Sequence, residues 1–355
     1  MNPPYRRLWA EEETGPSFGV MGKPDASQVL VPLDRRAATA GALIRHHAGM
    51  GAGERITRRL VSGAARVGLL KPLLRRRVSV DAGTSGQPSL HAEIARLLGQ
   101  SPLWLSVSFG PPRPNQKPVV RALDARGRTV GVAKIGWDTL TTALVEAEAA
   151  AVQMPALRRL THVTVPELIA LDEWRGHRLA VYKAEMGRPG RTNPSWEAFS
   201  EVATAWPTAR LQVENSPLTR SLADTGALAF EVLEVALARW GGIELQFGGW
   251  HGDWTPWNTA RRSGGGVVVW DWERAGPGVP LGFDMIHYRF QARATRGGYP
   301  VADLLADVRT WDPLARLLTS EEAEATAVWY LMAISHRHAG HRHLTYLEEL
   351  ARVLA

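Results

Sequence analysis

The residue pattern changes from strand-like to helix-like near residue 190, and this change limits the folds that the chain can adopt. Before it, short apolar segments of extended character alternate with turn residues. They occupy residues 103–109, 119–123, 129–136, 163–171 and 177–183. One helical pattern, at residues 140–154, interrupts the series. We interpret this order as a small antiparallel sheet with one helix.

The second half of the chain is predicted to be mostly helical. Five segments have apolar residues at helical spacing, namely 195–215, 222–241, 282–294, 319–337 and 342–354. A loop at 248–258 and a short hairpin, whose second strand is Val267–Trp270, lie between them. The predicted fold class is therefore α+β, with a small antiparallel-sheet lobe, residues 99–186, and a mostly helical lobe, residues 187–355.

The first 98 residues form a third zone in this division, an N-terminal extension of unknown role. The chain carries a formal net charge of +7. Its first 100 residues contain 15 Lys and Arg against 8 Asp and Glu, an excess as large as that of the whole chain. The basic character therefore belongs to the extension and not to the two lobes.

Residues 55–77 are the most basic part of this extension. They hold eight Lys and Arg and no acidic residue, interleaved with apolar residues and interrupted at Pro72. Two interpretations stay open. The segment docks on a membrane surface or another anionic partner, or it is a helix that packs on the main domain with a solvated basic face. We favour the second. Residues 81–88, which are small and turn-forming, are interpreted as a linker.

Several classes of protein are excluded or disfavoured by composition. The absence of cysteine excludes disulfides, thiol catalysis and thiolate metal sites. No run of about 18 apolar residues exists, which argues against a transmembrane helix, and the N-terminal residues lack the layout of a signal peptide. We therefore expect a soluble, cytoplasmic protein. Nucleic acid is not expected as a partner, because the basic residues cluster in one apolar-patterned stretch without a recognisable binding motif.

The segment from His251 to Asn258, with the sequence HGDWTPWN, carries the clearest chemical signal. Asp253 and Asn258 are five residues apart, and Asp271 follows at the end of the predicted hairpin, so all three belong to one neighbourhood. Protein kinases use an Asp that accepts a hydroxyl proton, an Asn five residues later and a further Asp. Carboxylate and amide oxygens also suit Mg²⁺. The spacing therefore predicts a phosphoryl-transfer site.

The motif His-Gly-Asp-x-x-x-x-Asn, followed by a hydrophobic strand that ends in Asp-Trp-Glu, resembles the aminoglycoside phosphotransferase and choline-kinase-like superfamily over residues 100–355. The resemblance implies a bilobal protein-kinase-like fold that uses ATP, or another nucleoside triphosphate, with Mg²⁺. It also implies that Asp253 is the catalytic base and that His251 supports the loop. Asn258 and Asp271 are then the metal ligands, and Asp284 matches a later Asp of that family.

The sheet lobe offers the partner residues that such a site needs. Lys134 lies on the third predicted strand, where a kinase Lys contacts the nucleotide phosphates and is held by a Glu of the following helix. Glu146 and Glu148 are both candidates. Residues two apart cannot share a helix face, so only one can form the pair, and the resemblance points to Glu148.

Two further segments are candidate nucleotide contacts. The loop at 109–117 has one glycine and three prolines, so it offers fewer backbone N–H groups to phosphates than a glycine-rich loop does. Arg113 or Lys117 could supply charge instead. The hinge that presents backbone groups to adenine is expected at Lys183, Ala184 and Glu185.

Two clusters have both a functional and a structural interpretation. Trp254 and Trp257 could stack on a sugar or a cation, or fill the core, whereas Trp270 and Trp272 are expected in the core. The segment 336–343 is rich in His and resembles a metal tract in composition. We interpret it as a solvated corner between two helices.

The sequence thus predicts an ATP- and Mg²⁺-dependent phosphotransferase that acts on a hydroxyl group of a small molecule, such as a sugar, an amino sugar or an aminoglycoside-like compound. Two alternatives stay open: a binding or scaffold module with a kinase fold, and a kinase that modifies a peptide or protein. A pseudokinase is disfavoured because none of the expected base and metal positions is substituted.

Overall fold

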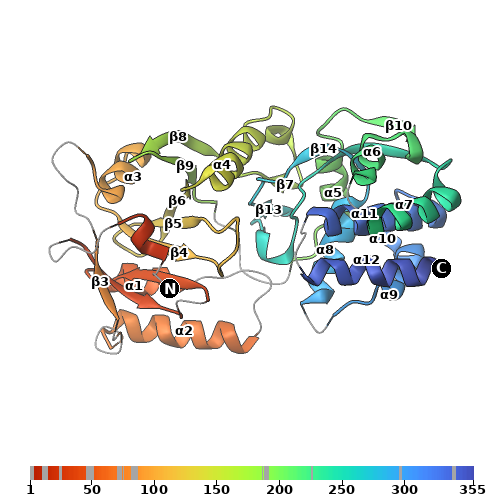
Figure 1. Ribbon diagram of the computed structural model, residues 1–355. Helices are drawn as coiled ribbons and strands as arrows, with labels where there is room; N and C mark the ends of the chain where they lie inside the picture. The colour runs from red at the N-terminus through yellow and green to blue at the C-terminus, as the bar shows by residue number, and fades with distance from the viewer. Residues whose placement is uncertain are drawn as a thin grey trace. The chain divides into compact units, whose positions relative to one another are not determined.

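The computed structural model of the protein contains two compact units, one built on a large sheet and one built mainly on helices (Figure 1). It describes residues 4–9, 15–23, 26–44, 52–69, 74, 76–80, 87–185, 187, 192–224, 227–295, 298–337 and 341–355. The sheet unit is formed by Met1–Gln153 with Pro166–Met186, and the helical unit by Met154–Val165 with Gly187–Ala355. The predicted α+β class is confirmed.

The sheet unit contains one eight-stranded sheet whose neighbouring strands are all antiparallel. In spatial order the strands are β3 (Arg77–Ser79), β1 (Ser17–Met21), β2 (Gln28–Pro32), β4 (Trp104–Phe109), β5 (Pro118–Leu123), β6 (Thr129–Gly136), β9 (His177–Lys183) and β8 (Leu168–Trp174). The predicted antiparallel sheet is therefore present, and it has more strands than the sequence pattern indicates.

Apolar side chains alternate between the two faces of this sheet, as the period of a strand requires. On β2, Leu30 belongs to the buried cluster that includes α3 (Leu90–Leu98), whereas Val31 belongs to the cluster that includes α1 (Arg36–Leu43). Both side chains are fully buried. The sheet therefore has two apolar faces, and helices pack on each.

The helix α4 (Thr139–Val152) follows β6 directly and packs on β6, β9 and β8. A capping box fixes its start: the Asp138 carboxylate accepts a hydrogen bond from Thr141 N at 2.9 Å, and Thr141 Oγ1 accepts one from Asp138 N at 3.1 Å. Val145 and Ala149 are fully buried, and Glu148 is buried beside them. The packing of α4 therefore brings one acidic side chain to the sheet.

The prediction that residues 1–98 form a zone apart from the sheet lobe is wrong. β1, β2 and β3 extend the sheet beyond β4, and β2 pairs with β4 from Gln28 opposite Phe109 to Leu30 opposite Val107. Without these strands β4 would present an unpaired edge beside an apolar face. Of the linker predicted at 81–88, only the last two residues lie within the described part of the chain.

The helix α2 (Ala52–Arg66) overlaps the first half of the basic stretch 55–77 and ends before Pro72. It packs on α1: Ser62 and Ala65 are buried, and Ser62 Oγ donates a hydrogen bond to Ala40 O at 3.1 Å. The interpretation that this helix packs on its own domain therefore holds for one of its faces.

The helical unit contains two three-stranded sheets among its helices. One has the order β10 (Ala209–Gln212), β11 (Glu244–Trp250), β14 (Gly276–Pro280), and the other β12 (Thr259–Arg261), β13 (Val267–Val269), β7 (Val163–Thr164). The helices are α5 (Trp196–Ala203), α6 (Pro217–Ala223), α7 (Ala227–Trp240), α8 (Phe283–Ala294), α9 (Val301–Thr310), α10 (Asp312–Ala315), α11 (Ser320–Arg337) and α12 (His341–Leu354). Among the described residues, no helix combines the length and the apolar character that a transmembrane segment requires.

Two predicted elements need correction. The helix predicted at 195–215 ends at Ala203, because Pro207 cannot continue it and the following residues pair with β11. The strand predicted at 163–171 is divided at Pro166, which has no N–H for a ladder: its first residues pair in parallel with β13, and β8 begins at Leu168.

Most of the other elements predicted for the helical unit are present. The helix predicted at 222–241 corresponds to α7, which begins five residues later, and α6 lies mostly between the two helices predicted at 195–215 and 222–241. The hairpin before residue 270 and the helices predicted at 282–294, 319–337 and 342–354 are confirmed, each helix to within one residue. α9 and α10 have no counterpart among the predicted elements.

The contribution of residues 1–98 to the sheet can be tested at Leu30. Leu30→Ala removes a fully buried side chain and leaves a cavity, so the free energy of unfolding should fall by about 2–5 kcal/mol. Denaturant unfolding measures this change. Leu140→Ala, at an exposed position of α4, is the control and should change it by no more than about 0.5 kcal/mol. Equal stability of the two variants would contradict the placement of β2.

Candidate active site

The loop that follows β11 is anchored through its backbone. His251 N donates a hydrogen bond to Asp284 Oδ2 at 2.6 Å, and Gly252 N donates one to Asp284 Oδ1 at 3.2 Å. Asp284 is buried in the first turn of α8. Gly252 has φ +82°, and a Cβ there would lie 2.3 Å from Arg274 O, so only glycine fits. Both carboxylate oxygens thus hold the entry of the loop in one conformation.

The imidazole of His251 joins this loop to the hairpin β12–β13. Its Nδ1 accepts a hydrogen bond from Asp253 N at 3.1 Å, so its proton is on Nε2, which donates to Trp270 O at 3.2 Å. The ring is fully buried, and burial lowers the pKa of His251 from its ordinary value of 6.5 to about 4. His251 is therefore neutral near pH 7, and it contacts the loop rather than a reacting group.

The carboxylate of Asp253 is oriented by Asn258. Asn258 Nδ2 donates to Asp253 Oδ2 at 2.9 Å and to Asp253 O at 3.0 Å. The side chain of Asp253 keeps 35% of its surface exposed, while Asn258 is buried. The loop thus presents a carboxylate that is held in place and is still accessible.

Asp271 follows β13 in an unusual backbone conformation, with φ +77°. Trp270 N, the preceding amide, donates to Asn258 O at 3.1 Å, so the end of the hairpin is bonded to the end of the loop. A non-glycine residue in this region is uncommon, and strained residues of this kind gather at functional sites. The hairpin therefore holds the Asp271 carboxylate close to the loop that carries Asp253 and Asn258.

Asn258 and Asp271 have the chemistry of Mg²⁺ ligands. The Asn258 side chain donates both of its hydrogen bonds through Nδ2, and among the described residues no donor lies within hydrogen-bond distance of its Oδ1. An amide oxygen and a carboxylate are hard ligands, and Mg²⁺ usually takes one or two protein oxygens together with waters and substrate phosphates. The residues present therefore fit the metal.

His287 and Tyr330 belong to this site, although the sequence analysis did not include them. His287 Nε2 lies 3.4 Å from Asp253 Oδ1, a long hydrogen bond, and His287 Nδ1 lies 3.0 Å from the hydroxyl of Tyr330. Both residues are buried. The available signal was the spacing of His287 three residues after Asp284, which places both on one side of α8. His287 thus contacts the carboxylate oxygen that Asn258 does not.

In the sheet unit, Lys134 on β6 forms an ion pair with Glu148 on α4. The Nζ–Oε distances are 2.6 and 2.7 Å, and both side chains are buried. Glu146 is half exposed and instead pairs with Arg178 at 3.0 Å. Of the two candidates, Glu148 is therefore the partner of Lys134.

The other candidate nucleotide contacts lie at the β4–β5 loop and at the end of β9 and just after it. Arg113 is exposed in a turn closed by Gln116 N and Arg113 O, whereas Lys117 is buried. Lys183 Nζ forms a surface ion pair with Glu167 at 3.3 Å. The N–H of Ala184 donates to Val130 O, which commits it to the sheet, so the backbone of Glu185 is the better candidate for contacting a base.

Of the four tryptophans of the loop and hairpin, two lie in the core, and Trp270, which was also expected there, is not one of them. Trp254 and Trp272 are fully buried; Trp254 packs on Phe199 with ring centroids 4.4 Å apart. Trp257 and Trp270 are half buried. Trp254 therefore fills the core and cannot stack on a ligand. The side chains of the His-rich segment 336–343 lie outside the described residues.

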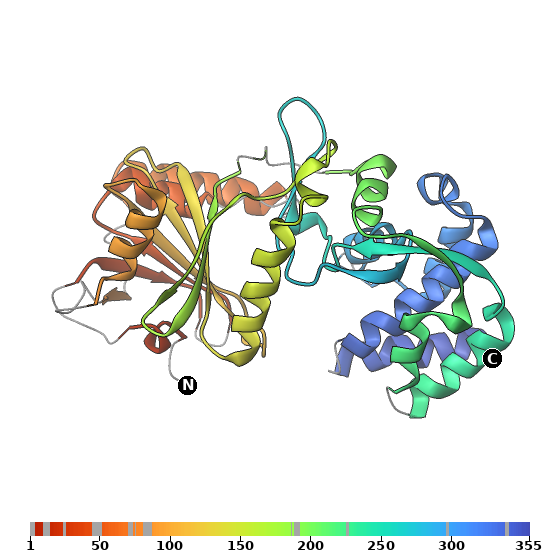
Figure 2. The same ribbon diagram turned by 90° about the horizontal axis from the view of Figure 1, so that it is seen from above.

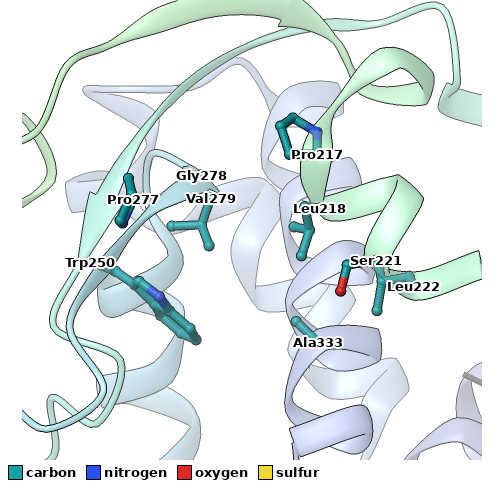
Figure 3. Close-up of a pocket in the computed structure, with 9 residues that line it drawn as sticks. All are labelled: Pro217, Leu218, Ser221, Leu222, Trp250, Pro277, Gly278, Val279 and Ala333. Atoms are coloured by element: carbon teal, nitrogen blue, oxygen red, sulfur yellow. The ribbon is translucent and has the colours of Figure 1, made fainter. Parts of the chain in front are cut away.

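A cavity of about 530 Å³ lies in the helical unit beside the loop (Figure 3). Its walls come from α6, the end of β11, β14 and α11. The lining residues are Pro217, Leu218, Ser221, Leu222, Trp250, Pro277, Gly278, Val279 and Ala333. Trp250 immediately precedes His251, and its ring lies 6.4 Å from that of His287. None of these nine residues carries a charge.

No family model and no curated protein sequence matches this chain. It is similar to solved phosphotransferase structures. A thermostable mutant of aminoglycoside phosphotransferase APH(4)-Ia, in a ternary complex with ADP and hygromycin B, has 12% identity and a TM-score of 0.49, over 75% of this chain and 98% of that one.

Two further structures are of the same kind. Aminoglycoside phosphotransferase APH(3'')-Id from Streptomyces rimosus has 15% identity and a TM-score of 0.39, over 63% of this chain and 92% of that one. An aminoglycoside phosphotransferase from Alicyclobacillus acidocaldarius has 15% identity and a TM-score of 0.36, over 76% and 94%. The structures to which the chain is similar thus include aminoglycoside phosphotransferases. This is the family whose motif resembles that of residues 251–273.

The burial of neutral His251 makes stability depend on pH. Between pH 6.5 and about 4 the unfolded chain protonates this imidazole and the folded protein does not, so its contribution is complete above pH 6.5 and is lost as the pH falls. The loss should reach about 3 kcal/mol of unfolding free energy. Denaturant unfolding at a series of pH values should therefore show a steeper acid loss for the wild type than for His251→Gln. Parallel curves would contradict the assignment.

Proposed function

We propose that the protein is an ATP- and Mg²⁺-dependent phosphotransferase that phosphorylates a hydroxyl group of a small molecule, such as a sugar or an amino sugar. The observation that carries this proposal is the hydrogen bond from Asn258 Nδ2 to the exposed Asp253 carboxylate, within a loop whose backbone Asp284 holds. A cytoplasmic location goes with the proposal, because that compartment supplies nucleoside triphosphates.

Asp253 acts on the acceptor in this mechanism. Its carboxylate accepts the proton of the acceptor hydroxyl as the oxygen bonds to the γ-phosphorus, the bond from that phosphorus to the bridging oxygen breaks, and the nucleoside diphosphate leaves. Asn258 and His287 each contact one carboxylate oxygen, so Asp253 needs little reorganisation when the hydroxyl arrives. Because His251 stays neutral, it adds no charge that would compete for the carboxylate.

Lys134 and the metal ligands serve the nucleotide. Lys134, oriented by its pair with Glu148, offers positive charge to the phosphate oxygens. Asn258 and Asp271 would hold Mg²⁺, which offsets negative charge on the phosphates when bound. Arg113, Lys117 and Lys183 are retained as proposed nucleotide contacts, with Ala184 and Glu185 at the hinge.

We assign the cavity beside Trp250 to the acceptor. Asp253 is not one of its nine lining residues, and the connection to it runs through His287: the His287 ring lies 6.4 Å from the ring of Trp250, and His287 Nε2 lies 3.4 Å from Asp253 Oδ1. A polycation placed against uncharged walls would lose hydration without gaining a countercharge. The nine uncharged lining residues therefore favour a neutral acceptor, such as a sugar, over an aminoglycoside.

The reaction can be tested directly with purified protein. Incubation with Mg-ATP and a panel of sugars, amino sugars and aminoglycosides should release ADP with at least one acceptor. Asp253→Asn should lower kcat about a hundredfold or more, because it removes the proton acceptor and keeps the shape. Asp312→Asn, at a side chain that is 82% exposed, is the matched control and should leave kcat unchanged.

Two further measurements on the same purified protein separate the alternatives. Thermal stabilisation by Mg-ATP without transfer to any acceptor would contradict the enzyme and favour a binding module. A mass increase of the protein or of an added peptide, found by intact-mass measurement, would indicate a protein kinase instead. Equal turnover by Asp253→Asn and the wild type would show that Asp253 is not the base.

The acceptor assignment has its own test. Leu218→Trp fills part of the cavity, so it should raise the KM for the acceptor about tenfold or more, as expected for removal of about 1.4 kcal/mol of binding, and leave the KM for ATP unchanged. Steady-state kinetics with the best acceptor of the panel measures both constants. Val353→Trp, at an exposed position of α12, is the control. An unchanged acceptor KM would show that the acceptor binds elsewhere, even if phosphoryl transfer is correct.

A further inference from the structure

The helix α2 carries large apolar side chains on its exposed face. Ile56, Leu60 and Val67 follow one another at intervals of four and seven residues, so they form a single stripe along α2 and the residue after it. Their exposed fractions are 58%, 70% and 64%, and Leu69 adds a side chain that is 62% exposed. These four account for almost half of the large apolar side chains that are exposed in the described part of the chain.

The opposite face of α2 explains why this stripe is not part of the core. It packs on α1 mainly through small side chains, because Ser62 and Ala65 are buried and Ala40 of α1 accepts the Ser62 hydrogen bond, and the partly buried Val61 adds one apolar contact to the same cluster. A helix whose only partner is its own domain turns its large apolar residues inward. Among the described side chains of α2, the fully buried ones are the small Ser62 and Ala65, and Val61 is partly buried against the same cluster, whereas the larger Ile56 and Leu60 face outward. Figure 1 labels α2 at the border of the sheet unit, and Figure 2 shows the same red-orange helix from above.

Basic side chains border the stripe. Arg59 and Arg66 are exposed and lie on one flank of it at the helical spacing of 100° per residue. The exposed Arg36 adds a guanidinium beside Gly68, where a Cβ would meet its Cζ at 3.0 Å. Residues 55–77 contain no acidic residue that would neutralise these charges. The surface is therefore apolar along its centre and positive at its border.

This combination points to one kind of occupant. A second copy of the same surface would bring arginines against arginines, and nucleic acid would leave the apolar stripe unused. An anionic bilayer matches both features, because acyl chains accept the apolar residues and headgroup phosphates accept the arginines. We propose that α2 lies in the headgroup region of an anionic lipid bilayer, with Ile56, Leu60 and Val67 inserted and Arg59 and Arg66 at the phosphates.

The proposal is independent of the phosphotransferase function, and vesicle co-sedimentation of the full chain tests it. The protein should bind vesicles of phosphatidylcholine with phosphatidylglycerol about tenfold or more tightly than vesicles of phosphatidylcholine alone, since each basic residue near the surface contributes. Replacement of Ile56, Leu60 and Val67 by Ser should weaken this binding about tenfold or more.

Matched variants keep the result interpretable. Phe230→Ser with Val235→Ser removes exposed apolar side chains from α7 and should leave binding unchanged. Because the stripe is exposed, the Ser variant should keep the unfolding midpoint of the wild type, so weaker binding cannot come from misfolding. Arg59→Gln with Arg66→Gln should weaken binding only to the anionic vesicles.

Four outcomes would overturn the proposal. The protein could bind neither kind of vesicle, or bind both equally. The Ser variant could bind anionic vesicles as the wild type does, which would leave only non-specific charge attraction. Finally, size-exclusion chromatography could show a dimer that the Ser variant loses, which would identify a second copy as the occupant.

Discussion

The buried carboxylate of Asp284 is the interaction on which the candidate site depends. A buried charge is costly unless donors surround it, and here the amides of His251 and Gly252 satisfy both oxygens. Asp284 also lies in the first turn of α8, where the helix dipole favours a negative charge. The amides that stabilise the carboxylate are those of the loop itself, so loop and helix fix one another. His251, whose backbone is held by Asp284, contacts Trp270 O through its imidazole, and in this way the loop is connected to the hairpin that ends at Asp271.

A buried pair of opposite charges has the corresponding role in the sheet unit. Lys134 and Glu148 are both buried, and each would be a costly isolated charge without the other. The pair forms because β6 leads into α4 through the Asp138 capping box, which fixes where the helix begins and therefore which of its residues face the sheet. Glu148 faces β6, whereas Glu146, two positions earlier, is directed to Arg178 at the surface.

What the sequence could predict follows from how local each signal is. The strands from β4 to β9 are bounded by turn residues such as Asp124 to Gly127, and Asp253, Asn258 and Asp271 are grouped by one loop and one hairpin. β1 and β2 were not predicted, because they join the sheet through pairings with segments far away in the sequence: β2 pairs with β4 and β1 with β3. β10 consists of Ala, Arg, Leu and Gln, which all favour a helix, and its pairing with β11 decides that it is a strand.

Tertiary contacts likewise explain why one residue of the candidate site could not be predicted from the sequence. His287 has no motif of its own, and its place beside Asp253 becomes visible only when α8 packs against the loop. The exposed stripe of α2 is a similar case. Helical periodicity shows that apolar residues share a face, but it does not show that the small residues of the other face take the contact with α1.

The same distinction separates the reaction from its acceptor. In the proposed reaction Asp253 requires only a hydroxyl whose proton it can accept, so the loop would constrain the chemistry and not the rest of the acceptor molecule. Selection among acceptors falls to the walls that surround the hydroxyl, and in the proposed cavity these come from α6, β14 and α11. The sequence pattern predicted neither α6, most of which lies between two predicted helices, nor β14. Because uncharged walls penalise a charged acceptor and accept a neutral one, the substrate class depends on how distant segments pack, whereas the reaction class can be predicted from one short motif.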